Sequence, residues 1–362
     1  MPRLPPVIDG IGDYSLLLAK RLSELHGIQT RFVVCDPEWK GPQTIDGFSI
    51  TTLKAKDKNA LAEAIDRSSV GLSDIVPVLI HFAPYAYSSR GCPVWILNAL
   101  QDRDKRNSQI LLTMYHELDA VTRIPWKSSF WLAPVQRQII RRLAVISAFA
   151  LTSAARYKDR LGNWGIKDVA LTPVFSNVGE PSINLPVEGR ERQMIVFGRP
   201  PQREICYTLG KLQLQHACTA AKATRVVDIG APMSFDGKEV CGIPIVRLGR
   251  LPATEISQLM SSSVASFLYY PQTLLTKSSV YAAICAHGAI PFVGSGPMDQ
   301  AKVKDLVDGL DFITVSKLGV SFQQDNLQTL SDQIFRRYHE RSSLNAANVL
   351  QGLLSRLPAK EH

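Results

Sequence analysis

Short apolar runs alternate with longer segments of helical periodicity along this chain of 362 residues. The runs are rich in β-branched residues and almost uninterrupted by polar positions, which is typical of parallel strands covered on both faces. We expect strands at residues 30–35, 76–82, 109–115, 149–153, 193–197, 224–229, 245–248, 265–269 and 290–293. Because helices separate these strands, the sequence predicts an α/β fold built from doubly wound parallel sheets.

A loop-rich stretch at residues 173–189 divides the strands into two groups. We therefore expect two Rossmann-like domains facing each other across a cleft, at residues 1–175 and 190–325. Residues 326–362 have a strongly helical pattern, and we expect these helices to cross back to the first domain. Ligands of doubly wound sheets bind at the carboxyl ends of strands, so the loops that follow strands are the candidate sites.

A glycine-containing loop, Pro5-Pro-Val-Ile-Asp-Gly-Ile-Gly-Asp-Tyr14, leads into the first helical segment. Gly10 and Gly12 lack a Cβ and allow backbone amides to approach a ligand, and a helix N-terminus favours an anion such as a diphosphate. Such a loop normally follows a buried parallel strand, but the residues before Pro5 are too few to form one. We expect either that the natural start lies upstream of Met1 or that the sheet has a gap at its centre.

The composition restricts the class of protein further. Apolar residues make up 45% of the chain and charged residues 20%, as in soluble globular proteins, and neither a membrane-spanning run nor a signal peptide is present. The six cysteines are scattered singly, which indicates reduced thiols in a cytoplasmic protein. The net charge of +9 favours anionic partners such as nucleotides or a membrane surface, but no nucleic-acid-binding motif accompanies it, so we expect no nucleic acid partner.

A second candidate ligand site follows the strand at residues 265–269. The next helix opens with Lys277, Ser278 and Ser279. Either serine could cap the helix, and Lys277 would direct its charge toward a ligand bound there. The alternative is a plain helix cap beside a solvated lysine.

This strand–loop–helix unit, which ends in Gly288-Ala-Ile-Pro291, resembles the nucleotide-sugar-binding unit of GT-B glycosyltransferases of the group 1, family 4 type. Further matches extend the resemblance over nearly the whole chain. They are Gly10-Ile-Gly-Asp-Tyr, Tyr115-His-Glu-Leu, Phe197-Gly-Arg and Leu248-Gly-Arg-Leu-Pro. Each motif alone is weak, and their order and spacing together are fairly specific.

The resemblance implies a GT-B-like fold and a hexosyltransferase that moves a sugar from a nucleotide-diphosphate donor to a hydroxyl. It also implies a lipid-linked or polysaccharide acceptor and no cofactor besides the donor. Donor binding would fall to the glycine loop, the two motif arginines and the helix start, with these residues: Gly10, Gly12, Arg199, Arg203, Lys277, Ser278 and Ser279.

The candidate catalytic residues come from the same motifs. His116 would contact the donor sugar, and Glu117 could act as the base for the acceptor hydroxyl or simply cap the next turn. Asp13 is the other candidate base, with helix capping as its alternative. No Asp-x-Asp follows a strand, so we expect no metal site.

The sequence departs from the family pattern at the donor site. Leu275 and Ala283 occupy the positions of the usual glutamate pair, and Glu204 replaces an expected basic residue beside Arg203. These replacements favour an alternative: a non-catalytic GT-B-fold protein that binds a nucleotide sugar or acts as a scaffold. Another sugar chemistry on the same fold, such as epimerisation, is a further alternative.

Two stretches of the first half are candidates for acceptor or membrane contact. His81 ends a strand and precedes Tyr85 and Arg90, a polar-aromatic content that fits an acceptor loop; a locally satisfied packed loop is equally compatible. Trp126 and Trp131 precede a helix with several arginines, which fits peripheral contact with anionic lipid. An aromatic core contact with a solvated helix face is the alternative.

Overall fold

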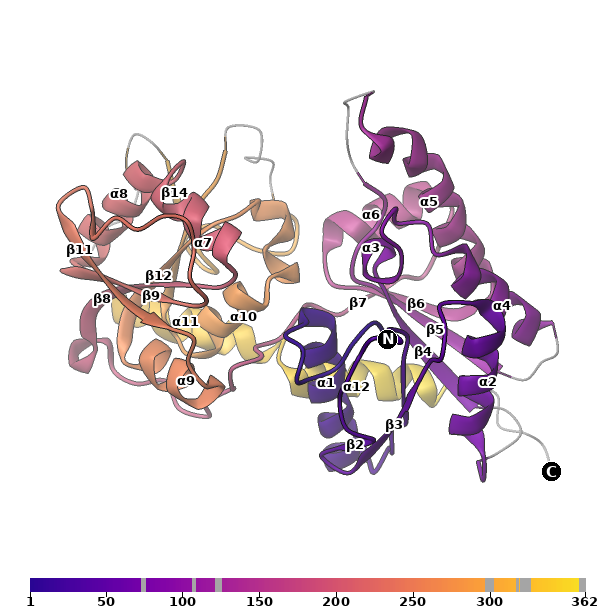
Figure 1. Ribbon diagram of the computed structural model, residues 1–362. Helices are drawn as coiled ribbons and strands as arrows, with labels where there is room; N and C mark the ends of the chain where they lie inside the picture. Colours follow the sequence, from indigo (N-terminus) through magenta and orange to yellow (C-terminus); the bar gives the residue numbers. More distant parts are fainter. Residues whose placement is uncertain are drawn as a thin grey trace. The chain divides into compact units, whose positions relative to one another are not determined.

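The computed structural model describes residues 1–72, 76–105, 109–120, 126–296, 303–316, 319 and 327–357 (Figure 1). The chain forms two compact units. One comprises Met1–Pro173 with Ala346–His362, and the other comprises Val174–Asn345. The loop-rich stretch after Pro173 thus belongs to the second unit, and the last part of the chain belongs to the first.

The strands of the first unit form two sheets, with the orders β1-β3-β2 and β4-β5-β6-β7. Neighbouring strands are parallel except β2 and β3. The strands are β1 (Phe32–Val34), β2 (Thr44–Ile45), β3 (Phe48–Thr52), β4 (Val76–Phe82), β5 (Gln109–Tyr115), β6 (Ser147–Thr152) and β7 (Ala170–Leu171).

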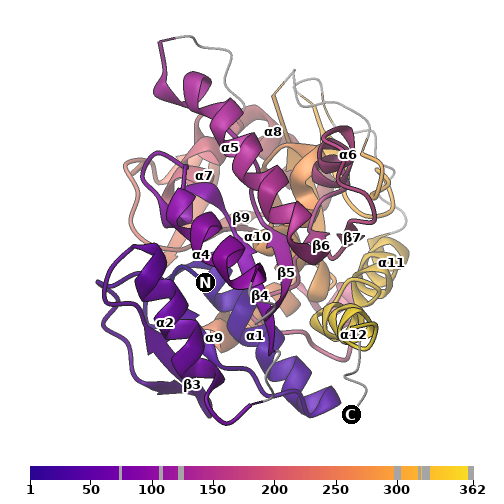
Figure 2. The same cartoon turned by 90° about the vertical axis from the view of Figure 1, so that its right-hand side faces the viewer.

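Helices cover both faces of the four-stranded sheet. Figure 2 shows α4 and α5 over one face of β4 and β5 and α1 behind the other. A hydrogen bond of 3.0 Å between His26 and Asn348 joins α1 to α12. The helices are α1 (Gly10–His26), α2 (Lys58–Ser69), α3 (Pro84–Tyr87), α4 (Val94–Asp104), α5 (Ser128–Val145), α6 (Ala155–Asn163) and α12 (Ser343–Leu354).

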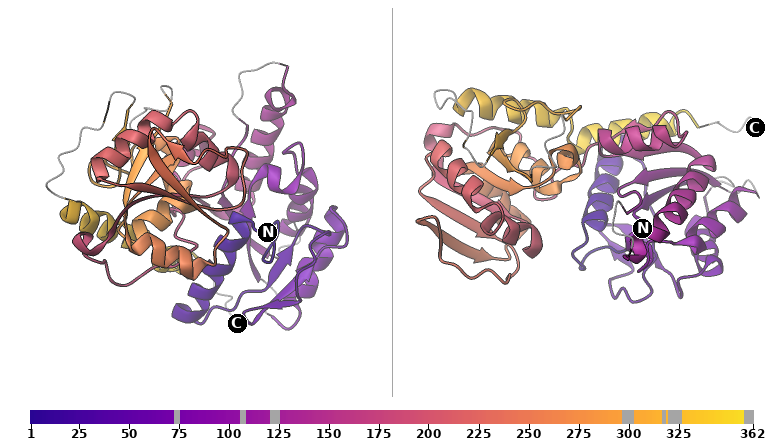
Figure 3. Two further views of the ribbon diagram at one scale, coloured as in Figure 1. Left: turned by 60° about the vertical axis from the view of Figure 1, so that its left-hand side comes forward. Right: turned by 90° about the horizontal axis from the view of Figure 1, so that it is seen from above.

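The second unit holds one sheet of seven strands in the order β10-β11-β9-β8-β12-β13-β14, parallel except for β10 beside β11. The left view of Figure 3 shows this twisted sheet between its helices. The strands are β8 (Glu191–Phe197), β9 (Arg225–Ile229), β10 (Glu239–Val240), β11 (Ile243–Gly249), β12 (Ser263–Tyr269), β13 (Ile290–Gly294) and β14 (Ile313–Val315).

In this unit α7 and α8 cover one face of the sheet, and α9, α10 and α11 cover the other (Figure 1). Successive residues of β8 accordingly point into different apolar clusters, with Met194 and Val196 in one and Ile195 in another. The helical elements are η1 (Val187–Gly189), α7 (Pro200–Tyr207), α8 (Lys211–Ala221), α9 (Ala253–Ser261), η2 (Gln272–Lys277), α10 (Ser279–Ala286) and α11 (Leu327–His339).

The architecture confirms the predicted α/β class with doubly wound parallel sheets. Every strand expected from an apolar run is present, with ends that agree within two residues. The short strands β2, β3, β7, β10 and β14 were not expected, because they are too short or too polar to produce a continuous apolar run. Between β1 and β4 the first unit has a cavity in place of a strand, so its sheet is interrupted as the second alternative anticipated.

Candidate functional site

The first unit brings two histidines together at the carboxyl ends of neighbouring strands. His81 is near the end of β4, and His116 directly follows β5, where its backbone N–H donates to Phe82 at 2.9 Å. The Nδ1 atom of His81 and the Nε2 atom of His116 are 3.0 Å apart, and each residue is 6% exposed. The ring of Tyr14 stands edge-on to both imidazoles, at centroid distances of 5.8 and 5.1 Å. The pair is therefore held by α1 as well as by the sheet.

Burial determines the protonation of this cluster. Burial, followed by the charges of His116 and of the Met1 ammonium, holds the pKa of His81 well below its ordinary value. Burial also raises the pKa of the Tyr14 phenol. At neutral pH His81 and Tyr14 are therefore uncharged, and one imidazole donates its N–H to the other.

The glycine loop is organised mainly by its own helix and by the N-terminal segment. Asp9 is the N-cap of α1 and accepts from the backbone N–H of Ile11 at 3.0 Å and of Gly12 at 3.1 Å. A Cβ added to Gly12 would meet the Arg3 carbonyl oxygen at 2.5 Å, so only glycine permits this approach. Gly10 has open space around it.

The two candidate bases adjoin this cluster in sequence. Asp13 lies in the first turn of α1, one residue before Tyr14, and it is Asp9 that caps the helix. Glu117 follows His116 and is half-buried, with its backbone N–H donating to Phe82 at 3.4 Å. Their roles as base stay predictions.

Tyr85 and Arg90 are brought together by a residue that sequence reasoning missed. Gln136, on α5, is 1% exposed and donates through Nε2 to the Tyr85 hydroxyl at 3.1 Å and to the Arg90 carbonyl at 3.3 Å. Its Oε1 accepts from the Ala120 backbone N–H at 2.8 Å. The amide thus fixes the loop after β4 to the loop after β5. His81, predicted for the same acceptor site, belongs instead to the histidine pair.

The aromatic residues around the start of α5 are exposed. Trp126 is 86% and Trp131 69% exposed, and the Trp131 ring stands edge-on to Phe130. Arg141 lies exposed further along α5, whereas Arg137 is hydrogen-bonded at 2.9 Å to the buried carboxylate of Asp119. The alternative of an aromatic core contact therefore does not describe these two tryptophans.

The second unit brings the Gly-Arg motif against the start of α10. Gly198, which follows β8, has a φ of +135°, and a Cβ there would meet the Val280 side chain at 3.4 Å. Arg199 begins α7 as its exposed N-cap residue. Ser278 is the N-cap of α10 and accepts from the Tyr281 backbone N–H at 3.2 Å, while Lys277 ends η2 just before it. Two loops with basic residues thus meet at the carboxyl ends of β8 and β12, and Ser279 is the first residue of the helix between them.

Arg203 lies inside this unit. It is 1% exposed, and its guanidinium pairs with Asp228 and donates to the carbonyls of Gly198, at 3.0 Å, and Ala231. A Cβ at Gly230 would lie 2.5 Å from the Gly198 carbonyl oxygen, so the loops after β8 and β9 are in close contact. The contacts of Arg203 therefore fix the Gly198 loop.

The two positions that depart from the family pattern are packed as apolar residues. Leu275 and Ala283 are both 0% exposed and belong to the apolar clusters on the α10 side of the sheet. No carboxylate stands at either position to bind a ribose. Within the described ranges, no group of three His, Cys, Asp or Glu side chains comes together to hold a metal ion. None of the helices in those ranges is long and apolar enough to span a bilayer.

Comparison with known proteins identifies the fold. The sequence matches no known protein family and no curated protein sequence, whereas several solved structures match nearly the whole chain. The E. coli trehalose-6-phosphate protein bound with UDP-2-fluoro glucose is similar with a TM-score of 0.59 at 10% identity, covering 99% of each chain.

Two further structures agree. The lipopolysaccharide outer core galactosyltransferase WaaB gives a TM-score of 0.53 at 13% identity and 98% coverage of this chain, 97% of that one. Sucrose-phosphate synthase from Thermosynechococcus elongatus gives 0.54 at 12% identity, covering 95% of this chain and 89% of that one. The chain therefore has the GT-B fold of these glycosyltransferases, as its motifs predicted.

Proposed function

We propose that this protein is a glycosyltransferase that moves a hexose from a nucleoside-diphosphate donor to a hydroxyl group. The observation that carries the proposal is the contact between the Gly198–Arg199 loop and the first turn of α10. There, backbone N–H groups at a helix start lie near two basic side chains, those of Arg199 and Lys277. Such a site suits a diphosphate, whose negative charge grows as the sugar leaves.

The first unit would supply the groups that act on the sugar. His116 offers a neutral ring nitrogen or N–H to a donor hydroxyl, and His81 fixes its orientation through the 3.0 Å contact. Glu117 or Asp13 would accept the proton of the acceptor hydroxyl. Gln136 would hold Tyr85 and Arg90 in place for the acceptor.

A non-catalytic nucleotide-sugar-binding protein is the second candidate function. It is favoured by Leu275 and Ala283, whose side chains are fully buried and cannot bind a ribose or sugar hydroxyl. Donor binding without turnover would distinguish this candidate from the first.

Incubation of the purified protein with UDP-, GDP- and ADP-hexoses, with hydrolysis and thermal shift both followed, tests both functions. A glycosyltransferase is expected to be stabilised by one donor and to release its nucleoside diphosphate slowly. Stabilisation with no release by any acceptor-containing mixture supports the second candidate, and a free epimer of the sugar indicates epimerase chemistry instead.

Four variants test the diphosphate site. Arg199→Ala and Lys277→Ala are expected to weaken donor binding by about tenfold each, because each removes a charge-assisted contact. Arg192→Ala and Lys211→Ala, which change exposed basic residues elsewhere in the same unit, serve as controls. Unchanged donor affinity in Lys277→Ala would remove Lys277 from the site.

We also propose that the acceptor is linked to a lipid and is met at an anionic membrane surface. Trp126 and Trp131 are exposed beside Lys127, and Arg141 and Arg142 are exposed on the same helix α5. Aromatic side chains beside basic ones suit the interfacial region of such a bilayer. Flotation with anionic vesicles is expected to carry the protein upward, and the double variant Trp126→Ser, Trp131→Ser should remain below. Leu209→Ser, at an exposed apolar site of the second unit, is the control.

A further inference from the structure

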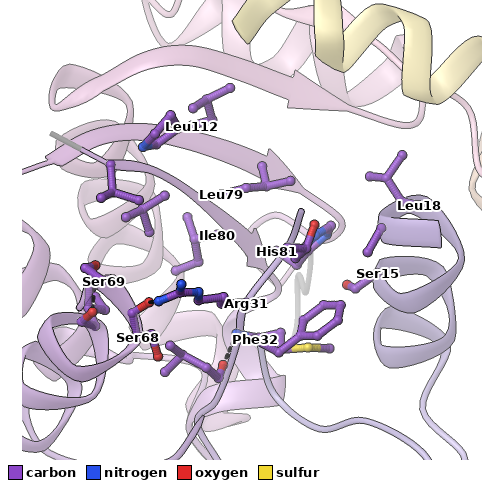
Figure 4. A pocket seen from close by; sticks show the side chains of 18 of the residues that line it. Ser15, Leu18, Arg31, Phe32, Ser68, Ser69, Leu79, Ile80, His81 and Leu112 are labelled. Atoms are coloured by element: carbon purple, nitrogen blue, oxygen red, sulfur yellow. Dashed lines mark hydrogen bonds between the residues drawn. The ribbon is translucent and has the colours of Figure 1, made fainter. Parts of the chain in front are cut away.

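A cavity of about 470 Å³ lies inside the first unit, away from the charged loops of the candidate site (Figure 4). Its walls come from α1, α2, α4 and α12 and from the strands β1 and β4. Most of its lining is aliphatic, including Leu18, Leu22, Leu61, Ile65, Ile80 and Leu350. The one guanidinium of its lining, that of Arg31, is hydrogen-bonded to the carbonyls of Ser68 and Val70 at 2.9 and 2.8 Å.

Two strand edges border this cavity. β1 is the outermost strand of the three-stranded sheet, and β4 is the outermost strand of the four-stranded sheet. Phe32 and Val33 of β1 and residues 76–81 of β4 all line the cavity. An edge strand carries backbone donors and acceptors that can pair with a further strand. The cavity therefore combines apolar walls with two edges able to form hydrogen bonds.

The first residue of the chain shows how a strand is placed there. The Met1 ammonium donates to the Val33 carbonyl at 2.9 Å, and the Met1 carbonyl accepts from the Cys35 N–H at 2.9 Å. This pattern is that of one residue of a parallel strand opposite Val34. A backbone leading toward Met1 in that direction would run beside residues 30–32, through the cavity. Met1 itself lines the cavity.

We propose that this cavity binds an extended, uncharged, apolar peptide, which adds as a strand between β1 and β4. Helices cover the cavity on both sides, so both faces of the added strand would carry aliphatic side chains. About five residues would span the stretch that residues 76–81 border, at roughly 3.3 Å per residue. A free carboxylate at the end of the peptide would lie beside the Met1 ammonium.

A peptide fits the cavity better than a hydrocarbon chain for a physical reason. Only a peptide backbone offers hydrogen bonds to both strand edges, whereas a hydrocarbon leaves their buried polar groups without a partner. This inference is independent of the sugar-transfer function, because none of the residues assigned to donor binding lines the cavity.

The full-length protein is titrated with a synthetic peptide of five valine and isoleucine residues, with a solubilising lysine tag at its N-terminus and a free C-terminal carboxylate. Saturable binding at one site and a rise in Tm are expected. The same peptide N-methylated at alternate residues is the matched control and should bind at least tenfold more weakly, because it cannot donate to a strand edge. The C-terminal amide should bind more weakly than the carboxylate.

The proposal is overturned if no peptide binds saturably, or if the N-methylated peptide binds as well as the parent. Displacement of the peptide by decanoate at similar concentration would also overturn it, since the site would then be only an apolar hole. Val78→Phe, which fills the cavity from β4, should abolish binding, and Val135→Phe, at an exposed position of α5, should not. If Val78→Phe fails to fold, the comparison of the two peptides still decides the question.

Discussion

The Nδ1 atom of His81 and the Nε2 atom of His116 lie 3.0 Å apart between the ends of two parallel strands. The contact requires one ring nitrogen to donate and the other to accept, so at least one imidazole must be neutral. Burial is the main reason that His81 is the neutral one, and the positive charge of the Met1 ammonium adds to it. The pair therefore couples the orientation of a candidate sugar-binding residue to pH.

The free energy of unfolding should fall as the pH drops below about 6.5, the ordinary pKa of histidine. Below that pH the unfolded chain takes up a proton at His81 that the folded protein, with its lowered pKa, does not. One such group changes stability by up to about 1.4 kcal/mol per pH unit. Denaturant unfolding at pH 5, 6, 7 and 8 measures the slope.

His81→Gln should flatten this slope, and His339→Gln, which changes an exposed histidine of the second unit, should leave it as in the wild type. Equal slopes for the wild type and His81→Gln would show that His81 titrates normally in the folded protein.

The two glycines of the first loop should respond oppositely to alanine. Gly12→Ala places a Cβ 2.5 Å from the Arg3 carbonyl oxygen and should destabilise the protein by about 1–3 kcal/mol. Gly10→Ala meets no atom within 4 Å and should be neutral or stabilising by up to about 1 kcal/mol. Thermal unfolding compares them. A stable Gly12→Ala would mean that the N-terminal segment moves aside easily.

The strands could be predicted from sequence because both faces of each sheet are covered, so that each strand is a continuous apolar run. His116, Gly198 and Ser278 were also identifiable, because they directly follow such runs or open a helix. Gly12 was expected to make room for a ligand, and the structure shows that it makes room for the Arg3 carbonyl.

Gln136 and Asp228 could not be identified in the same way. Each is a single polar residue within an otherwise ordinary apolar pattern, Gln136 on a helix and Asp228 near the end of a strand. Their importance depends on partners at sequence separations of 51 residues, to Tyr85, and 25 residues, to Arg203. A carboxylate inside a buried strand is nevertheless a signal that a buried cation pairs with it.

Asp228→Asn should therefore be severely destabilising, by about 3–5 kcal/mol, since it leaves the buried Arg203 guanidinium without a counter-charge. Glu191→Gln breaks a pair with Arg225 on the same two strands, but both side chains are about half exposed, so the loss should be at most about 1 kcal/mol. Urea unfolding of the two variants measures the difference. Similar losses in both would show that Arg203 is reached by solvent.

Asp311 provides the acid limit of stability for the second unit. Burial alone would raise the pKa of this carboxyl, but hydrogen bonds from Arg337, at 2.8 and 2.7 Å, and the charge of Arg341 outweigh burial and hold the pKa below its ordinary value. A lowered carboxyl pKa stabilises the folded state above about pH 4 and loses that contribution as the pH falls through the folded-state value.

Asp311→Asn should consequently lower Tm at pH 7 and should reduce the further loss of Tm between pH 4 and pH 2.5. Asp236→Asn changes an exposed carboxylate of the same unit and should follow the wild type over the whole range. Calorimetric scans at both ends of that range measure the effect. If Asp311→Asn loses as much Tm as the wild type on acidification, the two arginines hold α11 in place without a charged carboxylate between them.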